Sequence, residues 1–182
     1  TATEISSATI STDPSLTGKL ISTTGVVNSD QSIGDSLFLN PDIFIAAERK
    51  VEMYSWIEKT ESRSKKNTGG SETTEITYTY SKDWTEHPKN SSNFKHLEGH
   101  ENPQKSLDSY TSKATAATIG AYSFDPQSVT LPDSSRLSLN AQNVTLSDGA
   151  ILANDSYLFI RKSTDGTFDS PQAGDLRVSY HV

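Results

Sequence analysis

The stretch VEMYSWIEK, residues 51–59, decides the fold class of this chain. Two sets of side chains alternate along it, Val51, Met53, Ser55 and Ile57 on one face and Glu52, Tyr54, Trp56 and Glu58 on the other. This period of two is the period of side chains along a β-strand. Both sets carry bulky side chains. The pattern therefore predicts a strand with one buried face and an aromatic contact on the other face.

A second alternating run follows after a turn. Asn67–Gly70, NTGG, has turn composition, and Glu72–Trp84 then carries aromatic residues at even spacing. Two such runs on either side of a glycine-rich turn predict a long β-hairpin. The aromatic residues that we expect to pair across it are Tyr54 and Trp56 on one strand and Tyr78 and Tyr80 on the other. Each cross-strand pair contributes roughly 0.2–1 kcal/mol.

The rest of the chain has the texture of short strands. From Tyr122 onward, apolar alternations such as Leu176–Tyr180 recur between turn signals such as Asp148-Gly149. The Ala-rich stretch Ser112–Ala121 is compatible with a short helix or with a strand. The predicted fold is mainly β, with antiparallel sheets, the long hairpin and minor helix; an α+β fold is the alternative.

Length and composition indicate one domain. The chain has 182 residues, 32% of them hydrophobic, which suffices for a single core. Residues 1–15 are rich in Ser and Thr, and we interpret them as a polar lead-in that is partly disordered. Residues 16–182 form the predicted β-rich domain. No stretch approaches the roughly 18–20 apolar residues of a membrane helix, and a start at Thr1 suggests a piece of a longer protein.

Charge and cysteine content exclude several functions. The formal net charge is −7, which disfavours binding to a nucleic acid backbone. The chain has no cysteine, so disulfides and thiolate metal sites are impossible. A nucleophile elbow, a phosphate-binding loop and a dinucleotide fingerprint are all missing from the sequence. We therefore predict no cofactor and no enzyme activity.

Imidazole and carboxylate side chains gather in the polar segment Thr85–Asp108. The candidate metal ligands are His96, His100 and Glu101. Two histidines four residues apart bind zinc when a helix places them on one face, but Gly99 lies between them and no helical period surrounds them. We predict no metal site here.

A set of aromatic residues is the candidate interaction surface, because Tyr and Trp dominate binding hot spots. Its members are Tyr54, Trp56, Tyr78, Tyr80 and Trp84, joined by His100 and Asn102 from the polar segment. The favoured alternative is an aromatic ladder covered by the rest of the fold.

Four motifs, taken with the order in which they occur, carry a family resemblance. They are VEMYSWIEK (51–59), TYTYSKDW (77–84), NFKHLEGHENPQ (93–104) and AGDLRVSYHV (173–182). In order and spacing they resemble the luminal region of the transmembrane protein 43 (LUMA) family, over nearly the whole chain after Pro14. Asp125–Ala153 matches least clearly.

The resemblance implies a membrane protein with one helix before this domain and three after it. In animals such proteins lie in the endoplasmic reticulum and inner nuclear membrane, where they resemble scaffolds that associate with lamins and emerin. Asn90, Asn143 and Asn154 begin glycosylation triplets, which arise by chance in a Ser/Thr-rich chain. We expect a prokaryotic member, with the domain in the periplasm or at the cell surface; a eukaryotic member would have it in the lumen.

The function we expect is a non-catalytic extracytoplasmic scaffold or oligomerisation module of a multi-pass membrane protein. Its membrane contact would be made through helices absent from this chain, and its partners would be proteins or further copies of itself, without nucleic acid. The alternative is a ligand- or metal-binding domain, hydrolysis included, centred on Thr85–Asp108. Contact of the domain with lipid head groups is a third hypothesis.

Overall fold

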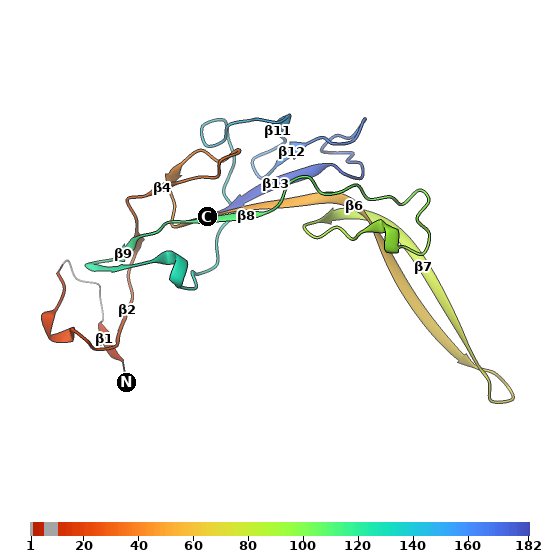
Figure 1. Ribbon diagram of the computed structural model, residues 1–182, viewed down its shortest axis with the longest axis horizontal. Helices are drawn as coiled ribbons and strands as arrows, with labels where there is room; N and C mark the ends of the chain where they lie inside the picture. The colour runs from red at the N-terminus through yellow and green to blue at the C-terminus, as the bar shows by residue number, and fades with distance from the viewer. Residues whose placement is uncertain (1, 6–10) are drawn as a thin grey trace. The chain divides into compact units, whose positions relative to one another are not determined.

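The computed structural model describes residues 2–5 and 11–182, and in this part of the chain β-strands dominate (Figure 1). The regular helices there are single 3-10 turns at Pro14–Leu16, Ser91–Asn93 and Pro126–Ser128. Apart from one parallel pair, the paired strands are antiparallel. The predicted mainly β fold, with antiparallel sheets and minor helix, is confirmed.

The described residues group into two compact units. The first contains the residues up to Arg49, Tyr110–Ser147 and Ser179–Val182, and the second contains Lys50–Ser109 and Asp148–Val178. Strands β6 (Ala46–Lys66) and β13 (Leu176–His181) each have residues in both units.

The second unit is organised by a sheet with the strand order β11-β12-β13-β6-β7. The strands not yet given bounds are β7 (Glu72–Thr85), β11 (Ala150–Leu152) and β12 (Leu158–Ile160). Val51, Met53 and Ser55 are fully buried, which confirms the predicted inward face of β6. All three residues of β12 are buried, as expected of a strand covered on both faces.

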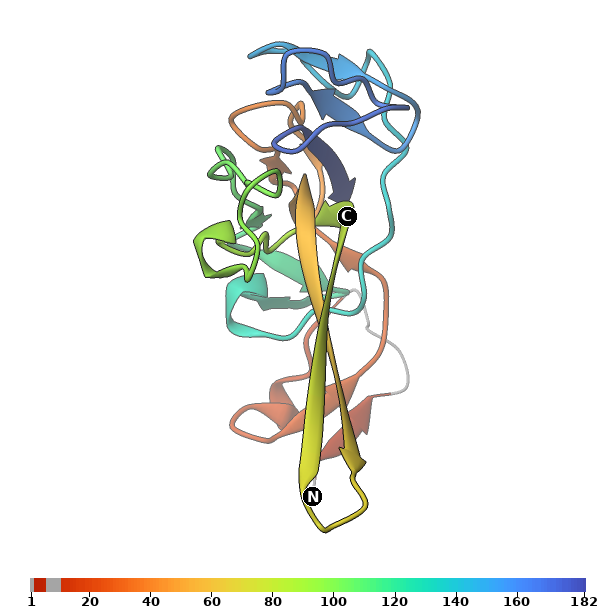
Figure 2. The same ribbon diagram turned by 90° about the vertical axis from the view of Figure 1, so that its right-hand side faces the viewer.

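The predicted hairpin is present and is built from β6 and β7 (Figure 2). The strands pair continuously from Met53 opposite Thr85 to Lys66 opposite Glu72. The Asn67 N–H closes the turn on the carbonyl of Ser71 at 2.8 Å. Gly69 and Gly70 have φ values of +118° and +86°, a region that glycine enters at little cost.

The predicted aromatic pairing across this hairpin is wrong. Tyr54 lies opposite Trp84 and Trp56 lies opposite Lys82, while Tyr80 faces Glu58 and Tyr78 faces Thr60. The physical reason is the turn: the chain reverses about Gly69, and the expected pairs would have needed a reversal nearer the β6 end. The aromatic residues of the two strands are therefore offset along the ribbon.

The first unit consists of short strands. Its members are β1 (Thr3–Ile5), β2 (Ile21–Thr23), β3 (Val27–Asn28), β4 (Ser32–Ile33), β5 (Asp42–Ile43), β8 (Tyr110–Lys113), β9 (Ala117–Ile119) and β10 (Tyr122–Phe124). β8 pairs with the first residues of β6, and β10-β9-β3 form a small sheet. The Ala-rich Ser112–Ala121 is thus strand and turn. Within the predicted lead-in, Thr3–Ile5 pairs with β2, whereas residues 1 and 6–10 lie outside the described part.

A buried carboxylate fixes the core of the first unit. Asp35 accepts the N–H groups of Phe38 and Leu39 at 2.7 and 2.8 Å, a hydrogen bond from Arg49 at 2.7 Å and one from the Tyr180 hydroxyl at 2.5 Å. Burial alone would raise the pKa of Asp35, but these hydrogen bonds outweigh burial and lower it. Burial beside this carboxylate raises the pKa of Tyr180.

Candidate functional site

The side-chain amide of Asn102 attaches the long segment after β7 to the edge of β6. Asn102 Oδ1 accepts the backbone N–H of Trp56 at 2.7 Å, and Nδ2 donates to the carbonyls of Trp56 and Lys89 at 2.9 and 3.1 Å. Backbone groups of a half-buried strand edge need partners. Asn102 supplies them as a neighbouring strand would, so this predicted interaction residue is occupied within the fold.

The same strand edge receives the segment before β13. Tyr54 donates its N–H to the carbonyl of Asp175 at 2.8 Å and accepts the N–H of Gly174 at 2.9 Å. Gly174 has φ +102°, and a Cβ there would lie 2.7 Å from the Pro103 ring. Three of the sequence motifs therefore meet at one place, which we call the motif junction: Tyr54, Trp56, Asn102, Pro103, Gly174 and Asp175.

Asp175 closes the loop before β13. Its carboxylate accepts the N–H groups of Lys162, Ser163 and Gln172 at 2.8–2.9 Å, together with the Ser163 hydroxyl at 3.0 Å. Burial opposes ionisation, but these donors hold the pKa of Asp175 below its usual value. A Cβ on Gly166 would lie 1.8 Å from Asp175 Oδ2. The Asp175 carboxylate therefore holds the loop closed against the start of β13.

A second cluster ties the polar segment to the hairpin. The Tyr80 hydroxyl donates to Glu58 Oε2 at 2.5 Å, the Lys95 N–H donates to the same oxygen at 2.6 Å, and the His96 N–H donates to the Tyr80 hydroxyl at 2.9 Å. The bond from Tyr80 lowers the pKa of Glu58. Burial, followed by this bond, raises the pKa of Tyr80.

The candidate metal ligands point to different partners. The His100 ring stacks on Tyr80 with centroids 3.9 Å apart, and its Nδ1 lies 3.0 Å from the carbonyl of His96. The His96 and Tyr78 rings are perpendicular with centroids 6.0 Å apart, and Glu101 accepts the N–H of Gly99 at 3.2 Å. In the described ranges, no three His, Asp or Glu side chains are grouped so as to hold a metal ion.

The other predicted aromatic residues form a row with cations. Tyr54 and Trp84 have centroids 5.2 Å apart, and the Lys82 ammonium lies 5.1 Å from the centroid of Trp56. Arg177 lies 4.9 Å from the Trp84 centroid and 4.5 Å from that of Tyr157, and its Nε bonds Glu52 at 2.7 Å. Sequence reasoning missed Lys82 and Tyr157; alternation with Trp84 on one strand was the available signal for Lys82.

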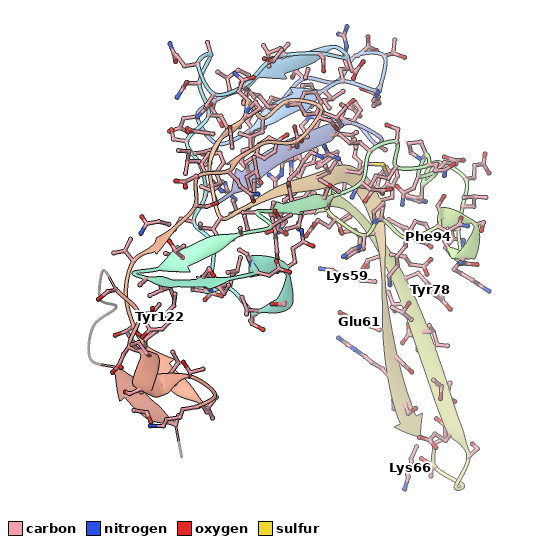
Figure 3. All side chains as sticks on the ribbon, turned by 60° about the vertical axis from the view of Figure 1, so that its left-hand side comes forward. Lys59, Glu61, Lys66, Tyr78, Phe94 and Tyr122 are labelled. Carbon is pink, nitrogen blue, oxygen red and sulfur yellow. The ribbon has the colours of Figure 1, made fainter. Side chains whose placement is uncertain are left out.

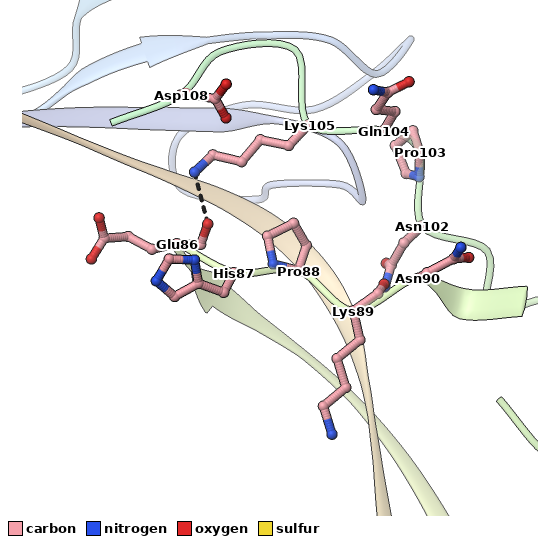
Figure 4. A pocket seen from close by; sticks show the side chains of 10 residues that line it. All are labelled: Glu86, His87, Pro88, Lys89, Asn90, Asn102, Pro103, Gln104, Lys105 and Asp108. Atoms are coloured by element: carbon pink, nitrogen blue, oxygen red, sulfur yellow. Dashed lines mark hydrogen bonds between the residues drawn. The ribbon is translucent and has the colours of Figure 1, made fainter. Parts of the chain in front are cut away.

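The segment Thr85–Asp108 also lines a hollow (Figure 4). Its lining is formed by Glu86–Asn90, Asn102–Lys105 and Asp108. The Lys105 ammonium donates to the carbonyls of Val51 and Glu86, both at 2.7 Å, and burial lowers its pKa. The hollow is polar, but its most buried cation is already engaged with backbone.

The outer half of the hairpin forms a free ribbon. Its residues Lys59–Lys66 and Glu72–Thr77 are exposed, and Lys59, Glu61 and Lys66 project from it in Figure 3. The sheet order ends at β7, so one edge of β7 has no neighbouring strand in the described part of the chain. The sequence predicted the hairpin, but it did not show that half of it would stand uncovered.

The comparisons agree with the motifs. The family model described as Transmembrane protein 43 matches residues 53–182. The chain is 27% identical to Transmembrane protein 43 of Homo sapiens and of Mus musculus, and 26% identical to that of Rattus norvegicus, each over 173 residues.

Each alignment covers 92% of this chain and 40% of the relative, so the chain spans less than half the length of these membrane proteins. No solved structure matches it. Over the described residues, no helix has both the length and the apolar character needed to span a bilayer. The match over most of the chain places it in the transmembrane protein 43 family.

Proposed function

We propose that this chain is a non-catalytic extracytoplasmic module of a membrane protein, through which copies of the protein associate or hold protein partners. The observation that carries the proposal is the free ribbon. Met53–Lys66 of β6 and all fourteen residues of β7 form a hairpin whose outer half is exposed. An isolated two-stranded ribbon is marginally stable in water, so a bound partner would give this half of the hairpin the stabilisation it lacks.

The chemistry of the motif junction supports the same proposal. Asn102 and Asp175 are engaged with backbone groups, and the Glu58 carboxylate is engaged with Tyr80 and the Lys95 N–H. Catalysis would need a carboxylate or imidazole within reach of a substrate. The motif residues instead fasten loops to the sheet and leave the ribbon as the available surface.

Shortening the ribbon tests the proposal. Glu61 and Thr77 face each other, so Ser62–Ile76 can be replaced by Asn-Gly, a turn that suits a two-residue hairpin. Two differently tagged copies of the full-length protein are then co-purified from membranes. We expect the protein with the intact ribbon to co-purify and the protein with the shortened ribbon to lose co-purification. The isolated domain should melt at the same temperature with either ribbon. Equal recovery with both ribbons, or no recovery with either, contradicts the proposal.

Placement on the extracytoplasmic face has its own test. The 182 residues lack cysteine, so Thr77→Cys introduces one thiol into them on the exposed ribbon. A membrane-impermeant maleimide should label this variant in intact cells beyond the background of the parent protein. Labelling that appears only after the cells are opened would place the ribbon on the other face.

The hollow beside Lys105 favours a second candidate function, binding of a small polar ligand or a metal ion in Thr85–Asp108. Binding to the folded state raises the melting temperature as ligand concentration exceeds Kd. A thermal-shift series of the 182-residue chain with Zn²⁺, Mg²⁺ and Ca²⁺ checks the metal form of this candidate. A melting temperature that does not change with any of the three ions rules out the metal form of this candidate.

A further inference from the structure

We infer that β7 of one copy pairs in antiparallel fashion with β7 of a second copy, about a twofold axis at Thr77. The inference rests on the proposed function and names its contact surface. Twofold dimers are the commonest protein assemblies, and their interfaces use the same patch on both copies. An edge strand that pairs with its own copy is the simplest such patch.

The backbone directions show which groups the edge offers. Tyr54 bonds Gly174 and Asp175, so its N–H and C=O point away from β7. Along a strand these directions alternate, and the register places Tyr54 opposite Trp84. The even-numbered residues of β7 therefore direct their backbone groups outward. From Glu72 to Lys82, these groups form a row of donors and acceptors that have no backbone partner among the residues the structure describes.

This edge lacks the usual protection. Natural sheets block free edges with lysine, proline, bulges or short strands. The stretch Thr73–Ser81, TTEITYTYS, contains one charge and no proline, and it pairs with β6 without a bulge. It is rich in Thr, Tyr and Ile, which favour strands. The first lysine of β7 comes only at Lys82.

Charge selects the partner and the register. With the axis at Thr77, Glu72 faces Lys82, Thr74 faces Tyr80 and Ile76 faces Tyr78, each pair occurring twice. Opposite charges and an aromatic beside a β-branched residue are favourable cross-strand pairs. A shift of the axis to Tyr78 places Lys82 opposite Thr74 and loses the ion pair.

Within the ribbon, the free edge of β6 is less suited than the edge of β7 to pairing with the same strand of a second copy. Its outer half carries the cations Lys59, Arg63, Lys65 and Lys66 against the single carboxylate Glu61. Two copies of this strand side by side would bring like charges together, which destabilises a pair. We therefore place the contact between the two copies at β7.

Single cysteines test the register directly. In the inferred dimer the two Thr77 residues face each other at a pair without backbone hydrogen bonds, with Cα atoms about 4.5 Å apart. That distance lies within the range of roughly 4.4–6.8 Å for disulfides. Thr79 is the matched control, because it is also an exposed threonine on the same ribbon face. Its two copies would lie about four residues, or roughly 13 Å, apart along the strands.

The experiment uses the 182-residue chain held by a polyhistidine tag on nickel-lipid vesicles and oxidised mildly. We expect a disulfide dimer with Thr77→Cys, and several-fold less with Thr79→Cys, Ile76→Cys and Tyr78→Cys. A maximum at Ile76→Cys or Tyr78→Cys, equal yields at all positions, or no dimer at any of them overturns the register. Ribbon-dependent co-purification without this cross-link would keep the proposed function and reject only the β7 pairing.

Discussion

Removing the Asn102 side chain should loosen the motif junction. Asn102→Ala deletes three hydrogen bonds, two to the backbone of Trp56 and one to the carbonyl of Lys89. Each is worth about 0.5–1.5 kcal/mol net. Trp56 is half-buried, so water can reach part of the exposed edge and offset some of the loss. We expect the free energy of unfolding to fall by about 2–4 kcal/mol.

Two control substitutions show whether the loss of stability comes from the hydrogen bonds of the Asn102 side chain. Gln104→Ala lies in the same loop on an exposed residue and should change stability by less than about 0.5 kcal/mol. Asn102→Asp keeps an acceptor for the Trp56 N–H but loses both donations to carbonyls. It should therefore destabilise nearly as much as Asn102→Ala.

The assay is equilibrium unfolding in urea, followed by tryptophan fluorescence, because Trp56 and Trp84 are the two tryptophans of the chain and Trp56 belongs to the junction. Limited proteolysis should also cut Thr85–Asp108 faster in Asn102→Ala. If Asn102→Ala unfolds at the same urea concentration as Gln104→Ala and the parent chain, the Asn102 amide does not stabilise the edge of β6.

Three further predictions concern other contacts. Gly166→Ala should lower the melting temperature strongly, since its Cβ would overlap the Asp175 carboxylate; melting that matches the parent would refute this. His100→Ala should cost about 0.5–1.5 kcal/mol in urea unfolding through the lost stack on Tyr80; no loss would show that the stack contributes nothing. The pKa of Asp35 is lowered in the folded state. Its contribution to the free energy of unfolding is therefore complete above its unfolded pKa of about 3.9, and this contribution is lost as the pH falls towards the folded pKa. Tyr180→Phe removes one of the bonds that lower this pKa, so its melting temperature should start lower and fall less between pH 6 and pH 3; an equal slope would contradict the assignment.

Local pattern predicted the elements of the second unit well. The alternation of Val51–Glu58 and the glycine-rich turn were enough to predict β6, β7 and the buried face of Met53. The register was not predictable, because it depends on which residues of the turn adopt positive φ, and Gly69 with Gly70 moved the reversal point. A small displacement of the turn changed every aromatic partner.

The motif junction depended on contacts between segments distant in sequence. Asn102 and Trp56 are 46 residues apart, and no period along the chain shows that a side-chain amide replaces a strand. Asp175 precedes the alternating stretch Leu176–Tyr180 in the sequence, but its four donors come from a loop that closes only in three dimensions. The motif letters identified the family, and the structure gives them a physical purpose.

The strength expected of the β7 pairing fits a protein held in a membrane. The cross-strand pairs together supply about 1–6 kcal/mol at roughly 0.2–1 kcal/mol each. Association of two free molecules costs an estimated 4–15 kcal/mol in lost freedom of motion, so such an edge alone gives only a weak dimer in solution. Tethering raises the effective concentration to the millimolar range, where the same contacts suffice. An edge of this kind would bring copies together on a membrane without causing the free domain to aggregate, and it would explain why the ribbon can remain unprotected.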